Sequence, residues 1–418
     1  MKCLKKSVVI FITAVCLLIT GCGDTGSLSK LPSSSFHEDK QKLTIMHIDA
    51  DNKRFQDFIE ETEKKLDMEI TVEKCPSNAD NRQAKISTIL ASGDKNIDLI
   101  SVNDEMISEF KHKGYLEPLE KNVMTEEVRD SFPQKYLESI CEENGHIYSV
   151  PFQMDIMMFW VNQELLKQAG LDEIKNTGDF DILQKSLKNP DQYAYGDAWE
   201  NTHVYNSLSQ FVNFWGGDYF DWTDPKTKDA ARYMKSMLDE KNTSPAQFVD
   251  QYEQMEEKFI RGKYGCVFMY TSALGTFLDA DVYGKNKMHM APLPVLHKKK
   301  ATNIATWQYV LNNASENKDA AVRFLQYAAG YEGSTEYAKI MKSYPARVDV
   351  IENEDIDLEG IDMIRKYLRE YTLNARPLCE NSMGAVSDMG KLFQGYVLGQ
   401  CEEDSFFEQA QNCINTYY

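Results

Sequence analysis

The feature that most constrains the fold is an alternation of strands and helices between residues 43 and 102. Three short apolar runs, at 43–48, 68–72 and 97–102, have the composition of buried strands. Between them, apolar residues recur at helical spacing, first over 55–66 and then over 86–93. Strand, helix, strand, helix, strand is typical of a mostly parallel sheet covered by helices on both faces. We therefore expect an α/β fold.

Polar loops follow two of these predicted strands. Asp49, Asp51 and Asn52 follow the first strand, and Asn103 and Asp104 follow the third. Ligands of open α/β sheets bind beyond the carboxyl ends of the strands, so these side chains are candidates for a binding site. Each of them could instead serve as a turn or helix-capping residue, and the sequence leaves both roles open.

The rest of the chain continues the mixture of helices and strands. Asp224 followed by Pro225 indicates a helix start, residues 307–312 indicate a strand, and residues 319–329 indicate a helix that ends at Gly330. No repeat of 20–50 residues is visible, which argues against solenoids and propellers. The length of 418 residues predicts two or three domains.

Charge and motif content argue against several classes of function. The chain has 65 Asp+Glu against 46 Lys+Arg, a net charge of −19 that repels nucleic-acid phosphates and anionic lipids. After residue 21 we find no G-x-S-x-G, H-E-x-x-H or P-loop motif, and no metal-finger spacing. Asp49, Asp51 and Glu60 match three EF-hand positions, but Lys53 and Arg54 occupy a ligand position and the required glycine. We expect no metal, no cofactor and no enzymatic activity.

The N-terminus carries the pattern of an export signal. Three lysines precede an apolar stretch at 8–19, which is too short to span a bilayer, and small residues then precede Cys22. This junction resembles a bacterial lipobox, which implies cleavage before Cys22 and a lipid on its thiol. We expect 1–21 to be the lipoprotein signal peptide and 22–39 a flexible polar tether. Loss of those three lysines changes the net charge from −19 to about −22.

Six cysteines follow the expected tether region, and their spacing does not give their disulfide state. They are Cys75, Cys141, Cys266, Cys379, Cys401 and Cys413. In an exported protein they could be oxidised, or they could be small buried apolar residues.

Several segments, in order along the chain, resemble one family. They are the Gly-His-Ile-Tyr-Ser-Val-Pro run at 145–151 with Asp155, the stretch at 159–171 that ends in Ala-Gly-Leu, the Phe-Ile-Arg-Gly-Lys strand that begins at 259, the segments at 292–295 and 307–325, and the Tyr-Pro-Ala-Arg turn at 344–347. Together with the lipobox they are similar to the extracellular solute-binding proteins of carbohydrate ABC importers, specifically lipoproteins of Gram-positive bacteria.

The resemblance implies a two-lobe, periplasmic-binding-protein-like fold of type II, with the ligand cleft between lobes joined by a hinge. It places the N-terminal lobe at 40–156 plus 305–350 and the C-terminal lobe at 157–304 plus 351–418. It also implies a sugar or oligosaccharide ligand and permease subunits as partners, at the extracellular face of a cell membrane reached through the N-terminal lipid. We expect a monomer, because closure of the lobes needs both faces of the cleft free.

Sugar recognition requires carboxylates or amides for the hydroxyls and an aromatic face for stacking. Asp155 lies where the family carries a ligand-binding acid or amide, and Ser272 stands where a Trp is usual, which puts stacking from that wall in doubt. The candidate ligand-binding residues are Asp49, Asp51, Asn52, Asn103, Asp104, Asp155, Trp199, Tyr205, Asn206, Trp215, Tyr270, Trp307, Tyr344 and Arg347.

Two alternatives stay open from the sequence. A polyamine, or another small solute, would suit an acidic cleft with aromatic rings equally well. A cell-surface glycoside hydrolase would also be exported and rich in aromatic residues, but it needs two carboxylates at a fixed separation, which sequence does not show.

Overall fold

The computed structural model describes residues 40–76 and 78–418 of the chain. The expected signal peptide, the tether at 22–39 and Cys22 lie outside the described residues. The first elements are β1 (Gln41–His47), α1 (Lys53–Leu66), β2 (Met68–Lys74), α2 (Ala79–Ser92), β3 (Leu99–Asn103), α3 (Asp104–His112), α4 (Glu126–Arg129), α5 (Gln134–Tyr136), the π-helix η1 (Leu137–Cys141), β4 (Glu142–Glu143) and β5 (His146–Ile147).

The later elements begin with the longest strand. They are β6 (Ser149–Asn162), α6 (Gln163–Gln168), α7 (Thr177–Ser186), β7 (Tyr193–Gly196), α8 (Val204–Trp215), α9 (Pro225–Asp239), the 3₁₀-helix η2 (Pro245–Val249), α10 (Tyr252–Ile260), β8 (Tyr264–Tyr270), α11 (Ala273–Asp279), β9 (Met288–Ala291), β10 (Ala301–Leu311), α12 (Lys318–Ala329), α13 (Tyr331–Met341), α14 (Val348–Glu352), α15 (Ile361–Glu370), β11 (Thr372–Ala375), α16 (Ser382–Val397) and α17 (Glu403–Tyr417).

A nine-stranded mixed sheet organises the chain. Its strand order is β2-β1-β3-β10-β6-β8-β7, with β11 paired to β10 and β9 paired to β6. The three strands predicted from the N-terminal alternation pair in parallel, as β2-β1-β3. β10 runs antiparallel to both β3 and β6. The α/β class predicted from the sequence is therefore confirmed.

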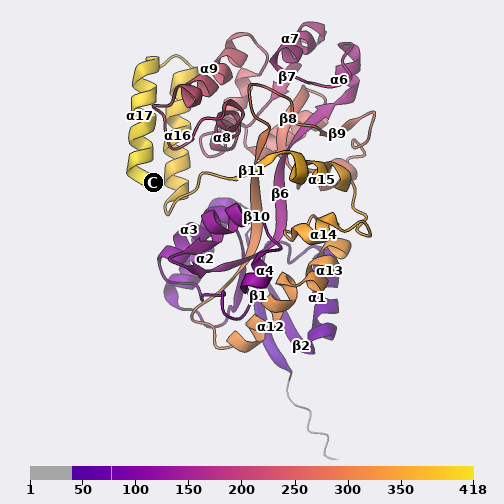
Figure 1. Ribbon diagram of the computed structural model, residues 1–418, viewed down its shortest axis with the longest axis vertical. Coiled ribbons are helices and arrows are strands. Elements are labelled where there is room, and N and C mark those ends of the chain that lie inside the picture. The colour runs from indigo at the N-terminus through magenta and orange to yellow at the C-terminus, as the bar shows by residue number, and fades with distance from the viewer. Residues whose placement is uncertain (1–39, 77) are drawn as a thin grey trace, which may run out of the picture. The chain divides into compact units, whose positions relative to one another are not determined.

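Strands β6 and β10 lie side by side and extend through both halves of this sheet (Figure 1). β6 pairs with β10 from Ser149 to Ile156 and with β8 from Met157 to Val161. We call the β2-β1-β3 side, with helices α1–α3, α12 and α13, the first lobe. The β8-β7 side, with helices α6–α11 and α15–α17, is the second lobe. The change of partner between Ile156 and Met157 therefore lies where one lobe passes into the other.

Helix ends follow the local rules that predicted them. Asn52 caps α1, with its side-chain oxygen accepting a hydrogen bond from the Arg54 backbone N–H at 2.9 Å. Gly93 ends α2 in the left-handed conformation (φ 63°), which costs glycine little. Asp224 caps α9, and Pro225 occupies its first turn. Asn52 thus fills the capping role that the sequence had left open, at the same edge as the predicted site.

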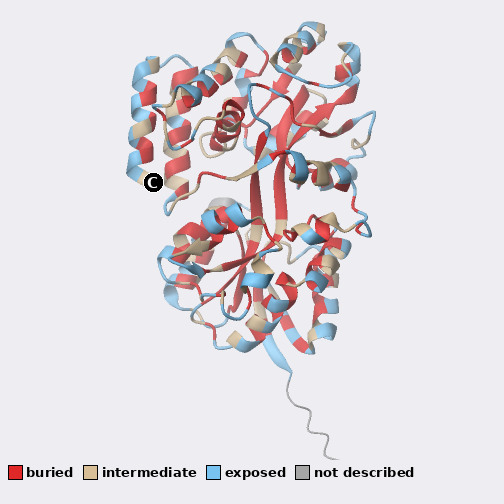
Figure 2. Ribbon diagram, in the orientation of Figure 1, coloured by how far each residue is buried: buried red, intermediate tan, exposed pale blue. Residues whose placement is uncertain are grey.

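The apolar core continues through both lobes along the strands. Figure 2 shows buried residues along β6, β8 and β10 and on the inward faces of the helices. Trp160, Trp199 and Trp222 are fully buried, and the Trp160 indole N–H donates to the Met269 carbonyl at 2.9 Å. No helix within the described part of the chain combines the length and apolar character needed to cross a membrane.

His47, at the end of β1, gives the fold a pH-dependent term. Its ring is fully buried and stacks on Phe55 with the centroids 3.8 Å apart. The Asp49 backbone N–H donates to Nδ1 at 3.0 Å, so this nitrogen is unprotonated. Burial lowers the pKa of His47 from 6.5 to about 3. Below pH 6.5 the unfolded chain therefore binds a proton at His47 that the folded chain does not bind. The free energy of unfolding decreases as the pH falls.

We expect protonation of His47 in the unfolded chain to lower the free energy of unfolding by about 2 kcal/mol between pH 7.5 and pH 5.0. Urea denaturation at the two pH values measures it, and His47→Asn should remove that share of the pH dependence. The matched control is His112→Asn, whose side chain is 57% exposed and which should keep the wild-type pH dependence. Equal pH dependence in His47→Asn and wild type would contradict this assignment.

Candidate functional site

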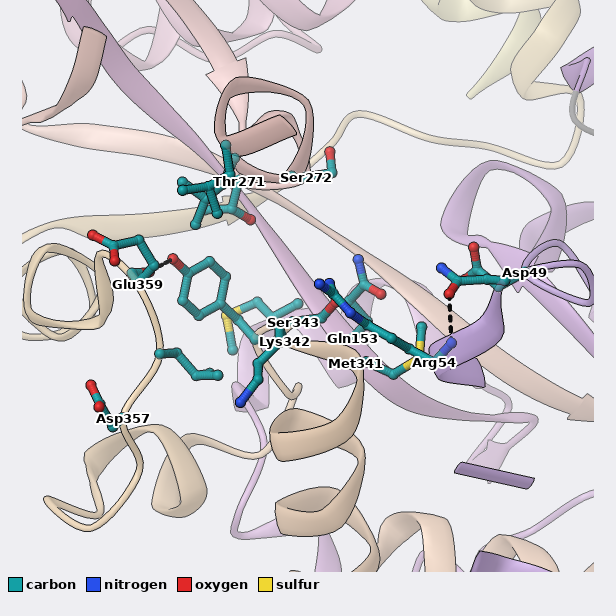
Figure 3. Close-up of a pocket in the computed structure, with 17 residues that line it drawn as sticks. Asp49, Arg54, Gln153, Thr271, Ser272, Met341, Lys342, Ser343, Asp357 and Glu359 are labelled. Atoms are coloured by element: carbon teal, nitrogen blue, oxygen red, sulfur yellow. Dashed lines mark hydrogen bonds between the residues drawn. The ribbon is translucent and has the colours of Figure 1, made fainter. Parts of the chain in front are cut away.

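A cavity of about 450 Å³ lies between the two lobes beside β6, within the size range of small-molecule sites (Figure 3). Both lobes and the segment after α14 contribute to it. Its lining consists of Asp49, Asn52, Arg54, Gln153, Met154, Thr271, Ser272, Leu274, Gly275, Leu278, Met341, Lys342, Ser343, Tyr344, Asp357, Leu358 and Glu359.

The floor of the cavity is built on β6. Side chains two residues apart on a strand share a face, so Gln153 and Asp155 lie on the same side of β6. Asp155 Oδ1 accepts hydrogen bonds from Thr271 Oγ1 at 2.7 Å and from the Ser272 backbone N–H at 2.9 Å. Burial raises the pKa of Asp155, and these donors oppose the rise. Asp155 therefore ties the cavity-lining loop of the second lobe to the floor.

The loop after β1 and the turn after α13 form the first-lobe wall. Asp49 and Asn52 line the cavity from the first, and Tyr344 lines it from the second. Burial raises the pKa of Asp49. The Tyr344 hydroxyl donates to the Glu359 carbonyl at 2.5 Å, which connects this wall to the segment between α14 and α15. The wall thus presents a carboxylate, an amide and one aromatic ring.

Outside the cavity lining, Asp104 and Glu105 of α3 meet Tyr205 of α8 and Arg376, which follows β11, in a largely buried group that we call the interlobe network. Arg376 is ion-paired with Asp104, and its Nη1 donates to Glu105 Oε1 and to the Tyr205 hydroxyl oxygen, both at 2.6 Å. The Tyr205 hydroxyl in turn donates to Glu105. Asp104 is 0% exposed and Arg376 8% exposed, so the charges are removed from water and depend on one another.

Further predicted residues surround this network. The Tyr270 hydroxyl donates to Asn206 Oδ1 at 2.9 Å, and its ring lies 5.9 Å from the Arg376 guanidinium. Asn103 donates through Nδ2 to Glu105 at 2.6 Å, while its buried Oδ1 has no partner among the described residues. Trp307 lies opposite Gln153 and Asn103 in the sheet, and Arg82 lies 5.3 Å from its ring. The structure thus gathers Asn103, Asn206 and Tyr270 around the interlobe network, and neither they nor Trp307 line the cavity.

Four predicted residues lie elsewhere. Asp51 is exposed and ion-paired with Lys74. Trp199 is fully buried in the second lobe, where its N–H donates to Asp197 at 2.8 Å. Trp215 stacks on His297 with centroids 5.1 Å apart, and Arg347 is buried in contact with Asp349 and the Ala329 carbonyl. None of the four lines the cavity, so none is retained in the site that we propose below.

Sequence reasoning missed several residues of the cavity and the network. Gln153 could have been found, because it shares a strand face with Asp155. Glu105 could also have been found, because it follows Asn103 and Asp104 at the start of α3. Asp357, Glu359 and Arg376 come from the last part of the chain, where no sequence pattern places them. All six cysteines within the described residues are free thiols.

Comparisons with known proteins agree with this geometry. The profile of the bacterial extracellular solute-binding proteins matches residues 49–335. A solute-binding protein of an ABC transporter from Thermotoga lettingae, solved with α-D-tagatose, superposes with a TM-score of 0.77 at 18% identity, over 90% of this chain and 99% of the other. The GacH receptor of Streptomyces glaucescens, solved unliganded and with acarbose, gives 0.75 at 17% identity, over 91% and 100%.

A curated relative adds a different name. A probable amino-acid ABC transporter periplasmic-binding protein of Sinorhizobium fredii is 23% identical over 239 residues, which are 54% of this chain and 54% of the relative. The chain thus spans about half the length of the curated relatives that it matches. The two-lobe fold expected from the sequence is confirmed by the solved structures. Their family consists of binding proteins rather than enzymes, as predicted.

The interlobe network predicts a large loss of stability when one partner is removed. Arg376→Met leaves two carboxylates without their cation, and we expect a loss of about 3–5 kcal/mol in the free energy of unfolding. Urea denaturation measures the loss. The matched control is Lys95→Met, which removes the cation of the exposed Lys95–Glu316 pair and should cost less than about 1 kcal/mol. Similar small losses in both variants would show that the buried pair contributes little.

Proposed function

The chain belongs to the bacterial extracellular solute-binding proteins, and from that premise we propose that it captures a sugar or oligosaccharide outside the membrane and delivers it to the permease of an ABC importer. The observation that carries the proposal is the cavity of about 450 Å³ between two lobes that share β6 and β10. The ligands in the solved relatives, tagatose and acarbose, support a carbohydrate.

The polar groups of the cavity suit a hydroxylated ligand. Asp49 offers a carboxylate acceptor, which forms stronger hydrogen bonds with hydroxyl groups than neutral acceptors do, and Asp155, which does not itself line the cavity, holds the lining residues Thr271 and Ser272. Asn52 and Gln153 offer amides, and an amide can both donate to and accept from a hydroxyl. The ring of Tyr344 offers an apolar face for the C–H side of a sugar. We propose Asp49, Asn52, Gln153 and Tyr344 as ligand contacts, with Asp155 as the residue that holds the lining loop.

Movement of the lobes around β6 and β10 would couple binding to transport. A ligand that contacts both lobes favours the closed arrangement by its differential affinity for the two states. Asp155 is placed for this coupling, because it belongs to β6 and holds Thr271 and Ser272 of the second lobe. The closed arrangement would then be the form that the permease subunits recognise.

We also propose that Cys22 carries the lipid that holds the mature chain at the extracellular face of the cell membrane. The lipobox-like junction at 19–22 supports this assignment, together with the extracellular family of the chain. The tether at 22–39 would give the binding lobes access to the permease. We propose that the protein acts as a monomer, because dimerisation through the cleft would block closure.

A thermal-shift screen of the mature chain tests the class of ligand. We expect mono- or oligosaccharides to raise the unfolding temperature, since a ligand at 100-fold over its Kd stabilises the folded state by about 2.7 kcal/mol. Spermidine and amino acids are the controls, the first because the cleft is acidic and the second because of the name of the curated relative. A shift with spermidine or an amino acid alone would overturn the carbohydrate assignment and keep the binding function.

Replacement of Asp155 tests the floor of the site. Asp155→Asn keeps the shape but removes the charge of the acceptor, and we expect affinity for the saccharide found in the screen to fall about 10-fold or more. Isothermal titration calorimetry measures the affinity. Asp51→Asn changes an exposed carboxylate that is paired with Lys74 outside the cavity lining, and this variant should bind as the wild type does. An unchanged affinity in Asp155→Asn would remove this residue from the site.

A further inference from the structure

Two cationic side chains reach the cavity without a partner. Arg54 lies in the first turn of α1, and Lys342 directly follows α13. Within residues 40–76 and 78–418, neither the Arg54 guanidinium nor the Lys342 ammonium makes a hydrogen bond or ion pair. The neighbouring Lys53, by contrast, is ion-paired with Asp57. Figure 3 shows the Arg54 side chain extended toward Gln153 and Ser343, so its charge is directed into the cavity.

Lys342 lies at the end of α13, where its backbone is left-handed (φ 57°). Both cations come from the first lobe, because α1 and α13 pack together. They therefore place two positive charges on the first-lobe wall, which also carries the Asp49 carboxylate.

The facing side of the cavity is negative. Asp357 and Glu359 line it from the segment between α14 and α15, and neither forms an ion pair with Arg54 or Lys342. Charged side chains that face one another across a cavity without pairing are available to bind a ligand with complementary charged and hydrogen-bonding groups. A solute that fits has an anionic group for the cations, and hydroxyl groups that donate to the carboxylates.

The aromatic content of the cavity also disfavours recognition by stacking. Tyr344 is the one aromatic ring among the 17 described residues that line it. Ser272 and Leu274 occupy the second-lobe wall, and neither offers a flat ring to a sugar face. Affinity for a neutral saccharide would then depend on hydrogen bonds alone. An ionic contact supplies the missing interaction, since charge-assisted bonds are about twice as strong as neutral ones.

We propose that the ligand of this cavity is an acidic saccharide of the uronic-acid class, whose carboxylate binds Arg54 and Lys342. The guanidinium fork matches a carboxylate in bidentate geometry, and the hydroxyl groups of the sugar face Asp357 and Glu359. The net charge of −19 repels an anion at long range, so two cations at the cavity supply the local attraction. This inference rests on the proposed function and names its substrate class.

The test compares saccharides that differ in charge alone. The mature chain is titrated in a calorimeter with trigalacturonate, with its methyl ester and with α-1,4-galactotriose, and likewise with glucuronate and glucose. We expect each uronate to bind at least 10-fold tighter than its neutral counterpart, with an advantage that shrinks as salt is raised. Equal or tighter binding of the neutral saccharides would overturn the inference and leave the proposed function intact. Binding of none of these saccharides would overturn the inference, while the thermal-shift screen decides the proposed function separately.

Single variants then test whether Arg54 is the cation that binds the uronate carboxylate. Arg54→Gln should weaken uronate binding about 10- to 100-fold while leaving binding of the neutral saccharide unchanged. Lys53→Gln, one residue away and outside the cavity lining, is the matched control and should bind the uronate as the wild type does. Because Arg54 is exposed and its guanidinium makes no hydrogen bond or ion pair within the described part of the chain, its variant should unfold at the wild-type temperature. Equal uronate affinity in Arg54→Gln and Lys53→Gln would remove Arg54 from recognition.

Discussion

The antiparallel pairing of β6 with β10 is the constraint on which the rest of the structure depends. β6 has 14 residues and β10 has 11, so each is long enough to pair within both lobes. Their register sets Gln153 opposite Trp307 and Asp155 opposite Ala305. Because side chains alternate between faces, a slip of one residue would turn Gln153 and Asp155 away from the cavity. The binding floor and the connection between the lobes are therefore fixed by the same hydrogen bonds.

Buried charges in this structure have hydrogen-bond or ion-pair partners, whereas two exposed charges at the cavity have none among the described residues. Asp197 is buried and accepts hydrogen bonds from Tyr195, Trp199, Ser207 and the Ala198 backbone. Asp104 is buried and paired with Arg376. These groups are satisfied because an unpaired buried charge costs several kcal/mol. Arg54 and Lys342 are exposed to the cavity instead, where water solvates them at little cost until a ligand replaces it.

The sequence predicted the parts of this structure that depend on local patterns. Periodicity located β1, α1, β2, α2 and β3, because each buries one face. Of the polar loop after β1, Asp49 and Asn52 line the cavity, and their role in binding stays a prediction. The interlobe network was beyond this reasoning, since Arg376 and Asp104 are 272 positions apart. Trp199 was assigned as a stacking ring because composition does not reveal that Asp197 holds its N–H inside the core.

Asp155 connects the chemistry of binding to the position of the lobes. Its Oδ1 already accepts two hydrogen bonds from the second lobe, so any ligand that shares this carboxylate competes with, or adds to, the contact that holds Thr271 and Ser272. The backbone N–H of Ser272 and the carboxylate are close enough that a shift of one changes the other. A ligand that contacts both would thus change the relative free energies of open and closed arrangements directly. Recognition and closure are then one equilibrium, which is what delivery of a captured solute requires.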